Sequence, residues 1–163
     1  MSSAVAAARE PADTDHFRRQ LRNAGLRVTG PRIAVLAALT HHPHSGAEAL
    51  FQLVRTELPG TSVQAVYNVL GDLTRAGILR RIEPAGSVAL YELCIGDNHH
   101  HLICSHCGQV RDVECVPAAA PCLQPSQDHG FAINEAEVTF WGVCPSCAGS
   151  QQEIAVDQLI EHE

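Results

Sequence analysis

Two Cys-x-x-Cys pairs carry the clearest chemical signal of this 163-residue sequence. Cys104 and Cys107 form one pair, and Cys144 and Cys147 form the other. Four thiolates in this arrangement suit tetrahedral Zn²⁺ with no coordination position left open, so the pattern predicts a structural zinc site. A redox dithiol of the thioredoxin type is the alternative, but it usually needs a single pair at a helix start in a βαβ setting. Structural zinc is therefore the favoured interpretation.

A second group of potential ligands combines imidazoles with carboxylates. His99 and His101 are two residues apart, so on a strand they share a face while His100 points away. Together with Glu92 and Asp112 they offer the nitrogen and oxygen donors that suit Fe²⁺, Mn²⁺ or Zn²⁺. An accidental run of surface histidines is the alternative. The spacing of these residues from the first cysteine pair favours a metal site.

Length and composition limit the class of protein. The chain has room for one ordinary domain or two small ones, which excludes a large multidomain enzyme, and 45% apolar residues is typical of a globular protein. Its longest apolar run, residues 33–39, is far shorter than the ~20 residues of a membrane span, so we expect no membrane association. The odd count of seven cysteines and the lack of a secretory signal favour the reducing cytoplasm.

Charge divides the chain into two halves. Residues 1–92 carry a net charge of +2 and residues 93–163 a net charge of −9, within a total of −7. All eleven basic residues are arginines, whose planar guanidinium binds phosphates and base edges. The first half is therefore a candidate for binding nucleic acid.

The pattern of apolar residues predicts an α+β fold with two domains. After a disordered segment 1–12, we expect a winged-helix DNA-binding domain at 13–92 and a small zinc-binding dimerisation domain at 93–148, followed by a tail at 149–163. Ser45 and Glu48 form a capping-box pattern at the start of the third helix. The predicted helices are 13–25, 29–39, 45–58, 61–77 and a short one at 116–125. The predicted strands are 78–82, 88–92, 99–104, 109–113 and 131–141.

The fourth predicted helix has the features of a DNA-recognition helix. Gln64 and Asn68 point away from its apolar face, and amides there can pair with adenine in a major groove. Tyr67 lies at the edge of that face, within reach of a thymine methyl group or a phosphate. Simple solvation of these side chains is the alternative. The expected apolar face is Val63, Val66, Leu70 and Leu73. Further candidate DNA contacts are Ser62, Arg18, Arg19, Arg22, Arg27 and Arg32.

These motifs resemble the ferric uptake regulator family. The resemblance covers about residues 14–148 and rests on segments 25–32, 44–48, 62–70 and 97–108 and on the second cysteine pair. The phrase Ile-Gly-Asp-Asn-His-His-His at 95–101 is most similar to the actinobacterial iron- and peroxide-responsive repressors, whose members often regulate catalase-peroxidase.

The resemblance implies a homodimeric, metal-dependent repressor that binds AT-rich inverted-repeat DNA. It implies structural zinc at the four cysteines, and a regulatory Fe²⁺ or Mn²⁺, with Zn²⁺ as a possible substitute in vitro. The regulatory ligands it implies are His44, Glu92, His99, His101 and Asp112. His44 would come from the DNA-binding domain, so a bound metal would fix the orientation of the two recognition helices. An aspartate at position 112 is associated with relatives in which peroxide oxidises a ligand histidine.

The sequence also departs from the pattern of some relatives. A further metal site of the family uses a histidine where this chain has Ala136 and an acid where it has His100, so we expect that site to be absent or altered. Cys94 matches a thiolate ligand of zinc-sensing relatives, which makes a zinc-sensing uptake regulator the alternative. Arg80 stands about where those zinc sensors need an aspartate, so the iron and peroxide interpretation stays ahead.

Two other classes of protein remain as alternatives at this stage. One is a zinc-dependent or thiol enzyme, although no nucleophile or phosphate-binding loop accompanies the candidate ligands, and we therefore expect no enzyme. The other is a zinc-ribbon interaction module that does not contact DNA. Cys115 and Cys122 have no assigned role and are read as buried apolar residues rather than a redox pair.

Overall fold

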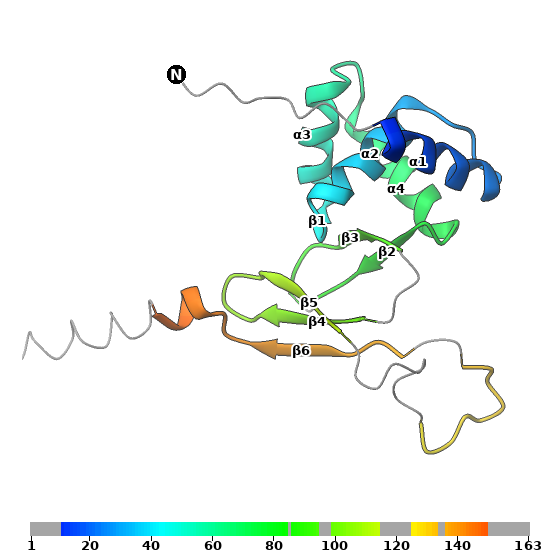
Figure 1. Ribbon diagram of the computed structural model, residues 1–163. Helices are drawn as coiled ribbons and strands as arrows, with labels where there is room; N and C mark the ends of the chain where they lie inside the picture. Colours follow the sequence, from blue (N-terminus) through cyan, green and yellow to red (C-terminus); the bar gives the residue numbers. More distant parts are fainter. Residues whose placement is uncertain (1–10, 85, 95–98, 115–124, 134–135, 150–163) are drawn as a thin grey trace, which may run out of the picture. The chain divides into compact units, whose positions relative to one another are not determined.

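The computed structural model describes residues 11–84, 86–94, 99–114, 125–133 and 136–149 (Figure 1). The chain divides into two compact units, Met1–Ile95 and Gly96–Glu163, called here the N-terminal and C-terminal units. No helix within the described ranges combines the length and apolarity needed to cross a bilayer. The predicted helix at 116–125, apart from Pro125, and nearly all of the predicted tail lie outside the described residues, as do Cys115 and Cys122.

Within the described residues four helices build the N-terminal unit (Figure 1), and each of them contributes buried side chains to its apolar core. They are α1 (Pro11–Asn23), α2 (Gly30–His41), α3 (Ala47–Glu57) and α4 (Val63–Arg75). α1 begins earlier than the expected start at Asp13 or Thr14. Gly25 and Gly77 follow α1 and α4 with φ values of 71° and 68°, the left-handed conformation that ends a helix.

The core of this unit combines buried side chains of all four helices with a few from the segments that follow them. Its fully buried members include Leu21 of α1, Leu36 of α2, Leu50 of α3 and Leu70 of α4. The predicted apolar face of α4 is confirmed at Val66, Leu70 and Leu73, with Val69 added. Val63 was wrongly assigned to this face, because it is 41% exposed at the first turn of the helix.

A small sheet completes the N-terminal unit. β1 (Ser45–Gly46) and β2 (Leu79–Ile82) both pair antiparallel with β3 (Leu90–Leu93), so the order is β1-β3-β2. The predicted capping box at Ser45 is wrong, because Ser45 pairs with Tyr91 in the sheet and its hydroxyl donates to the His42 carbonyl. Gly46 takes the N-cap position of α3 without a side-chain cap.

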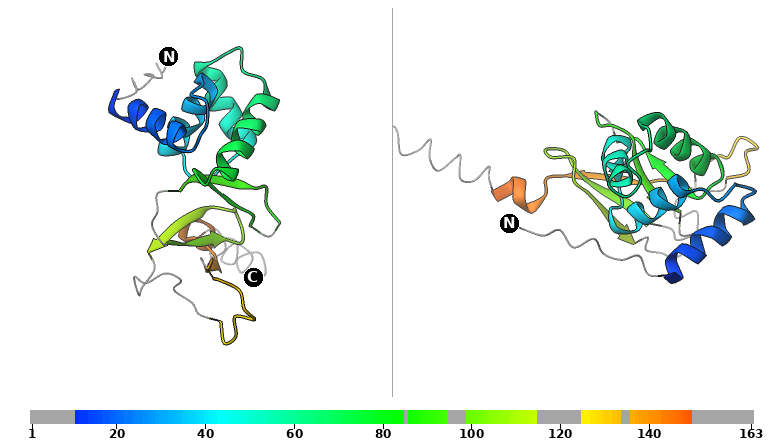
Figure 2. Two further views of the ribbon diagram at one scale, coloured as in Figure 1. Left: turned by 90° about the vertical axis from the view of Figure 1, so that its right-hand side faces the viewer. Right: turned by 90° about the horizontal axis from the view of Figure 1, so that it is seen from above.

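The C-terminal unit is built on a second three-stranded sheet, β5-β4-β6 (Figure 2). β4 (His99–Cys104) pairs antiparallel with β5 (Val110–Glu114) and parallel with β6 (Thr139–Gly142). The predicted strand at 131–141 is largely wrong: residues 131–133 have no regular structure, and Phe131 is 77% exposed. A short helical segment at 145–149 follows β6 and carries Cys147.

Candidate metal centres and DNA-binding surface

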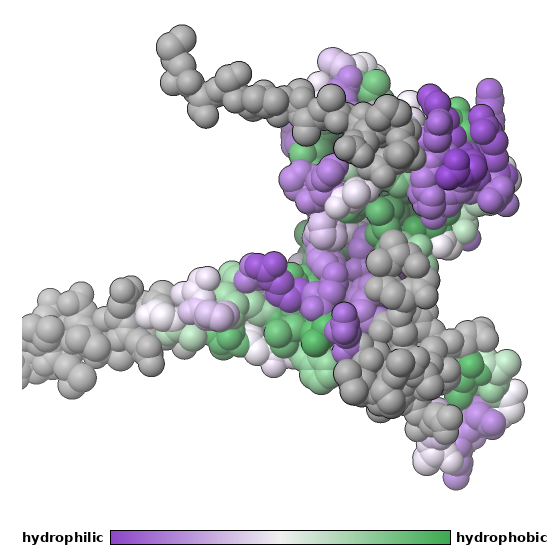
Figure 3. Space-filling view, viewed as in Figure 1, coloured by the Kyte–Doolittle hydropathy of each residue, from purple (hydrophilic) through white to green (hydrophobic). Residues whose placement is uncertain are grey.

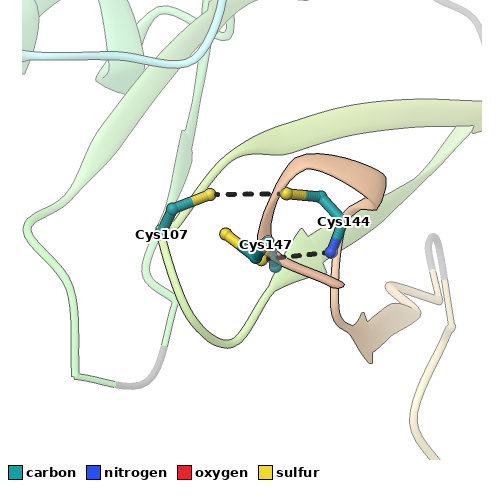
Figure 4. A group of neighbouring side chains, drawn as sticks. Cys107, Cys144 and Cys147 are labelled. Carbon is teal, nitrogen blue, oxygen red and sulfur yellow. Dashed lines mark hydrogen bonds between the residues drawn. The ribbon is translucent and has the colours of Figure 1, made fainter. Parts of the chain in front are cut away.

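The four cysteines of the two Cys-x-x-Cys pairs come together in the C-terminal unit. Cys104 ends β4, Cys107 lies in the turn after it, and Cys144 and Cys147 lie beyond β6. All four sulfur atoms lie within 4.8 Å of one another. Figure 4 shows Cys107, Cys144 and Cys147 turned toward a common centre.

The spacing of these sulfur atoms fits a zinc ion. The Sγ atoms of Cys107 and Cys144 are 3.8 Å apart. Tetrahedral bonds of about 2.3 Å between zinc and sulfur require about 3.8 Å between sulfurs. Four thiolates leave no position open for a substrate or water, so the donor set suits a structural rather than a catalytic ion.

Backbone amides favour the thiolate form of one of these cysteines. The Cys144 N–H donates to the Cys104 Sγ at 3.3 Å. This bond, with further amide donors at Cys107 and His106, lowers the pKa of Cys104 to about 6. The pKa of Cys147 is raised to about 12, first by its side-chain contacts with Cys144 and Cys107. Because metal binding requires the thiolate form of a cysteine ligand, a bound cation would favour deprotonation of Cys147.

A second ligand group of the C-terminal unit gathers His99, His101 and Asp112. The Nε2 atoms of His99 and His101 each lie 3.9 Å from Asp112 Oδ1. Their register explains the grouping, because His101 and Asp112 are directly opposite each other on β4 and β5. The rings of His99 and His101 are 5.0 Å apart, whereas His100 packs edge-on toward Phe140 at 6.1 Å. The predicted alternation of the three histidines is therefore confirmed.

These three side chains can hold a metal ion with modest adjustment. Two imidazole nitrogens and a carboxylate oxygen form a donor set common to Fe²⁺, Mn²⁺ and Zn²⁺. Ligand bonds of about 2.1 Å bring neighbouring donors to about 3 Å, so the 3.9 Å separations would close slightly around an ion. Three donors leave further coordination positions open.

The N-terminal unit contains a separate pair of candidate ligands. His44 Nε2 lies 2.9 Å from Glu92 Oε2, and both side chains are at least nine-tenths buried. His44 has a φ of 56°, which is unusual for a residue with a side chain. The pairing of β1 with β3 explains the contact, because Ser45 lies opposite Tyr91 and the preceding residue therefore reaches Glu92.

Arg80, which the sequence analysis placed where zinc-sensing relatives need an aspartate, also belongs to this group, and its contact with Glu92 was not predicted. It lies directly opposite Glu92 on β2, and its Nη1 atom is 3.3 Å from Glu92 Oε1. Its position in the hairpin was the available signal, but only the register of the two strands identifies the partner. Cys94, the alternative ligand, follows β3 and is exposed, with its backbone N–H donating to the Ile78 carbonyl.

Comparisons with known proteins identify the family of this chain. The family model described as "Ferric uptake regulator family" matches residues 23–141. The transcriptional regulator FurA of Mycobacterium tuberculosis is 54% identical over 132 residues, which cover 81% of this chain and 90% of that relative. The chain belongs to the ferric uptake regulator family.

Solved structures of ferric uptake regulators share the fold. The regulator of Francisella tularensis, solved with iron, is 25% identical, with a TM-score of 0.64 over 76% of this chain and 96% of that one. The Helicobacter pylori regulator Fur, whose structure is described as revealing three functional metal binding sites, is 22% identical, with a TM-score of 0.64 over 84% of this chain and 92% of that one. The predicted α+β fold is thus confirmed.

Membership of the ferric uptake regulator family decides between the classes of protein left open by the sequence. Members are metal-responsive transcriptional regulators that bind DNA and act as dimers, and they are not enzymes. The enzyme and zinc-ribbon alternatives are therefore set aside. The remaining candidate residues of the sequence analysis concern DNA, and the N-terminal unit carries all of them.

The candidate recognition helix α4 presents polar groups on its outer face. Tyr67 is 49% exposed, and Gln64 and Asn68 are both exposed. The Gln64 Nε2 donates to the Asn68 Oδ1 at 3.0 Å, which aligns the two amides along the helix. The Ser62 hydroxyl accepts from the Ala65 N–H at 3.2 Å, so Ser62 is the N-cap of α4. These positions suit contacts with base edges and adjacent phosphates.

The predicted phosphate-binding arginines have different surroundings. Arg22 at the end of α1 and Arg27 after it are exposed. Arg32 is only 14% exposed and binds inside the unit: its Nη2 lies 2.6 Å from Asp72 Oδ2, and its Nη1 donates to the Arg27 carbonyl at 2.7 Å. Arg32 therefore ties α2 to α4, whereas Arg22 and Arg27 remain accessible to a ligand.

The sheet of the C-terminal unit leaves an apolar face in contact with solvent. Leu102 of β4 lies opposite Phe140 of β6, and these side chains are 44% and 48% exposed. Val113 of β5, on the same face, is 38% exposed. Figure 3 shows hydrophobic side chains gathered over β4 and β6. Apolar patches of this kind commonly mark a protein interface.

Proposed function

We propose that this member of the family is a dimeric repressor that binds AT-rich inverted-repeat operators when a regulatory Fe²⁺ or Mn²⁺ is bound. Its signals would be iron and peroxide, and its targets would be genes of iron metabolism or oxidative stress, such as catalase-peroxidase. The observation that carries the proposal is the grouping of His99 and His101 around Asp112, because this donor set has open positions suited to a responsive ion.

The regulatory ion would take ligands from both units of the chain. The C-terminal unit offers His99, His101 and Asp112, and the N-terminal unit offers the buried pair His44 and Glu92. Neither group alone satisfies an ion that prefers five or six donors. Ligation by both would link the metal site to the orientation of α4, since β1 and β3 belong to the same unit as that helix.

This linkage gives a physical mechanism for repression. A symmetric dimer reads two half-sites at once only if its two recognition helices have the required separation and angle. His44 and Glu92 would restrict the orientation of the DNA-binding unit when they bind the same metal ion as His101 and its neighbours. Without that restriction, more orientations become populated and the affinity for the operator falls.

The response to peroxide would depend on the histidine ligands. Bound iron supplies the redox chemistry through which peroxide oxidises a nearby side chain. Oxidation of His99 or His101 would remove a nitrogen donor from the group at Asp112 and release the DNA-binding unit. A zinc-sensing regulator that uses Cys94 is the alternative, and it predicts dependence on Zn²⁺ and insensitivity to peroxide.

Dimerisation would use the C-terminal unit. Its exposed face, with Leu102, Val113 and Phe140, suits a second copy of the chain, as the family's dimeric state requires. The four cysteines would brace the segment after β6 against β4 through zinc, which would give this small unit a fixed shape. Zinc would therefore be structural, and a separate ion would be regulatory.

DNA-binding titrations test this proposal. Zinc-loaded protein prepared anaerobically is titrated onto an AT-rich inverted-repeat duplex and onto a scrambled duplex, with added Fe²⁺, Mn²⁺ or Zn²⁺ or with no added metal. We expect Fe²⁺ or Mn²⁺ to increase affinity for the inverted repeat and H₂O₂ to reverse the Fe²⁺ effect. Binding that ignores metal would contradict the regulatory site, whereas binding that responds only to Zn²⁺ would favour the alternative.

A further inference from the structure

The Glu92 carboxylate contacts two side chains, the candidate metal ligand His44 and the guanidinium of Arg80. Its Oε2 atom lies 2.9 Å from His44 Nε2, while its Oε1 atom lies 3.3 Å from Arg80 Nη1. The Glu92 side chain is 5% exposed and that of Arg80 is 21% exposed, so water screens this ion pair only weakly. Arg80 therefore stabilises the Glu92 carboxylate when no metal ion is bound.

The strand pairing fixes this contact. Arg80 and Glu92 are opposite each other in the register of β2 and β3, so their side chains emerge on the same face of the sheet. That face lies opposite the one on which Leu79 and Tyr91 join the helical core. Arg80 consequently points toward the candidate ligands rather than toward the apolar interior of the helices.

We propose that Arg80 determines how strongly the regulatory site binds its metal, by stabilising Glu92 in the metal-free protein and opposing the approach of a divalent cation. The inference rests on the proposed function, because it assumes that Glu92 is a ligand of the regulatory ion. Arg80 acts through Glu92 and is a positioning residue rather than a ligand. Its effect is to lower the affinity of the site, so that the site stays without metal at low metal concentration.

Electrostatics gives the direction of this effect. A guanidinium remains charged at any physiological pH, so it neutralises the Glu92 carboxylate that would otherwise attract a cation. A hydrogen bond from a cation also draws electron density from the carboxylate, which makes its oxygens weaker donors. Removing Arg80 would therefore destabilise the metal-free protein and strengthen the attraction for metal, and both changes raise the affinity.

A purely structural ion pair would behave differently. In that case the loss of Arg80 would lower the stability of the metal-free and metal-loaded proteins alike, and metal affinity would stay unchanged or fall. Arg81 offers a matched control on the same strand. It lies opposite Tyr91 on the other face of the sheet, forms an ion pair with Glu83, and is 47% exposed.

The experiment compares R80Q, R80M and R81Q with the wild type, all as full-length, zinc-loaded chains. Mn²⁺ is the probe, and its affinity is measured by chelator competition and by the electron paramagnetic resonance signal of unbound Mn²⁺. We expect R80Q and R80M to bind Mn²⁺ about tenfold more tightly, at the lower end of outer-shell effects on metal sites. R81Q should bind within about twofold of the wild type.

Thermal unfolding provides a readout that does not depend on DNA. We expect R80Q to lower the Tm of the metal-free protein and to increase the rise in Tm on saturation with Mn²⁺. The Mn²⁺ concentration that half-activates DNA binding should fall by the same factor as the Kd for Mn²⁺. Agreement between these readouts would support the role of Arg80 in metal binding.

The outcomes separate this inference from the function on which it depends. Unchanged or weaker Mn²⁺ binding in the Arg80 variants, beside a wild type that responds normally to metal, would overturn only the inference. Failure of both variants to fold would also overturn it, because Arg80 would then belong to the fold itself. A wild type that shows no Mn²⁺-dependent DNA binding would contradict the proposed function.

Discussion

The Nε2 atom of His44 lies 2.9 Å from the Oε2 atom of Glu92, across a sheet whose first strand is two residues long. That strand, β1, lies between α2 and α3, and its pairing with β3 holds this connection against the sheet. His44 adopts a left-handed backbone conformation directly before it. A conformation that is unfavourable for a histidine is thus maintained beside a candidate ligand, as is common at functional sites.

Replacing His44 with asparagine tests its role as a ligand. Asparagine tolerates a positive φ, so the backbone at this position should be preserved while the imidazole is lost. We expect H44N to remain folded. The factor by which Mn²⁺ increases DNA affinity should be at least tenfold smaller in H44N than in the wild type. Fluorescence anisotropy with the inverted-repeat duplex measures this change.

The neighbouring His42 provides the control for this variant. Its side chain is exposed at the end of α2, and H42N should keep the full response to metal. Equal responses of H44N and wild type would remove His44 from the regulatory site. Loss of the response in both variants would point to a general effect at the end of α2.

The cysteine group predicts that a single substitution removes zinc. In C104S the hydroxyl is a poor zinc ligand, and the amide donors around position 104 lose the thiolate that they stabilise. We expect zinc content to fall well below that of the wild type and the dimer to dissociate. Zinc analysis and analytical ultracentrifugation measure the two effects.

C94S is the matched control, because Cys94 is exposed and does not belong to the four-cysteine group. It should retain zinc and remain dimeric. A dimeric C104S protein with a full zinc content would show that the four-thiolate assignment is wrong. If C94S instead lost its response to added Zn²⁺ in DNA-binding assays, the zinc-sensing alternative would gain support.

Much of the N-terminal unit could be predicted because its signals are local. The buried positions of α4 recur with the helical period, and Gly25 and Gly77 follow the helices whose ends they were expected to mark. The capping box failed for a tertiary reason. Ser45 has the residue type of an N-cap, but pairing with Tyr91 draws it into the sheet, and no local pattern reveals that competition.

The group around Glu92 depends on register, which residue spacing does not determine. Aligning the ends of the predicted strands 78–82 and 88–92 would place Ile78 opposite Glu92. The structure instead pairs Ile82 with Leu90, a shift that brings Arg80 opposite Glu92. The histidines on β4 were easier to interpret, since alternation within a single strand already places His99 and His101 on one face.

The outer face of α4 predicts base-specific contacts. Replacing Asn68 with alanine removes an amide that can pair with adenine, so N68A should lose about 1–3 kcal/mol of binding free energy for the operator. Its affinity for a scrambled duplex should change little. Q52A is the control, because Gln52 is an exposed glutamine of α3 that binds Glu48. A uniform loss on both duplexes would instead assign Asn68 a role outside sequence recognition.

Two arginines with different surroundings should respond differently to substitution by alanine. Arg32 binds Asp72 of α4 and the Arg27 carbonyl, so R32A should lower the free energy of unfolding by about 1–2 kcal/mol and weaken DNA binding through the position of α4. Exposed Arg22 should behave as a phosphate contact. In R22A we expect an unchanged Tm. The slope of the logarithm of the DNA-binding constant against the logarithm of salt concentration should decrease in magnitude by about 1. Denaturant unfolding and salt titrations on the same two proteins distinguish the roles. Equal losses of stability in both variants would contradict the assignment of Arg22 as a phosphate contact only. A reduced salt dependence in R32A alone would instead make Arg32 the residue that contacts DNA.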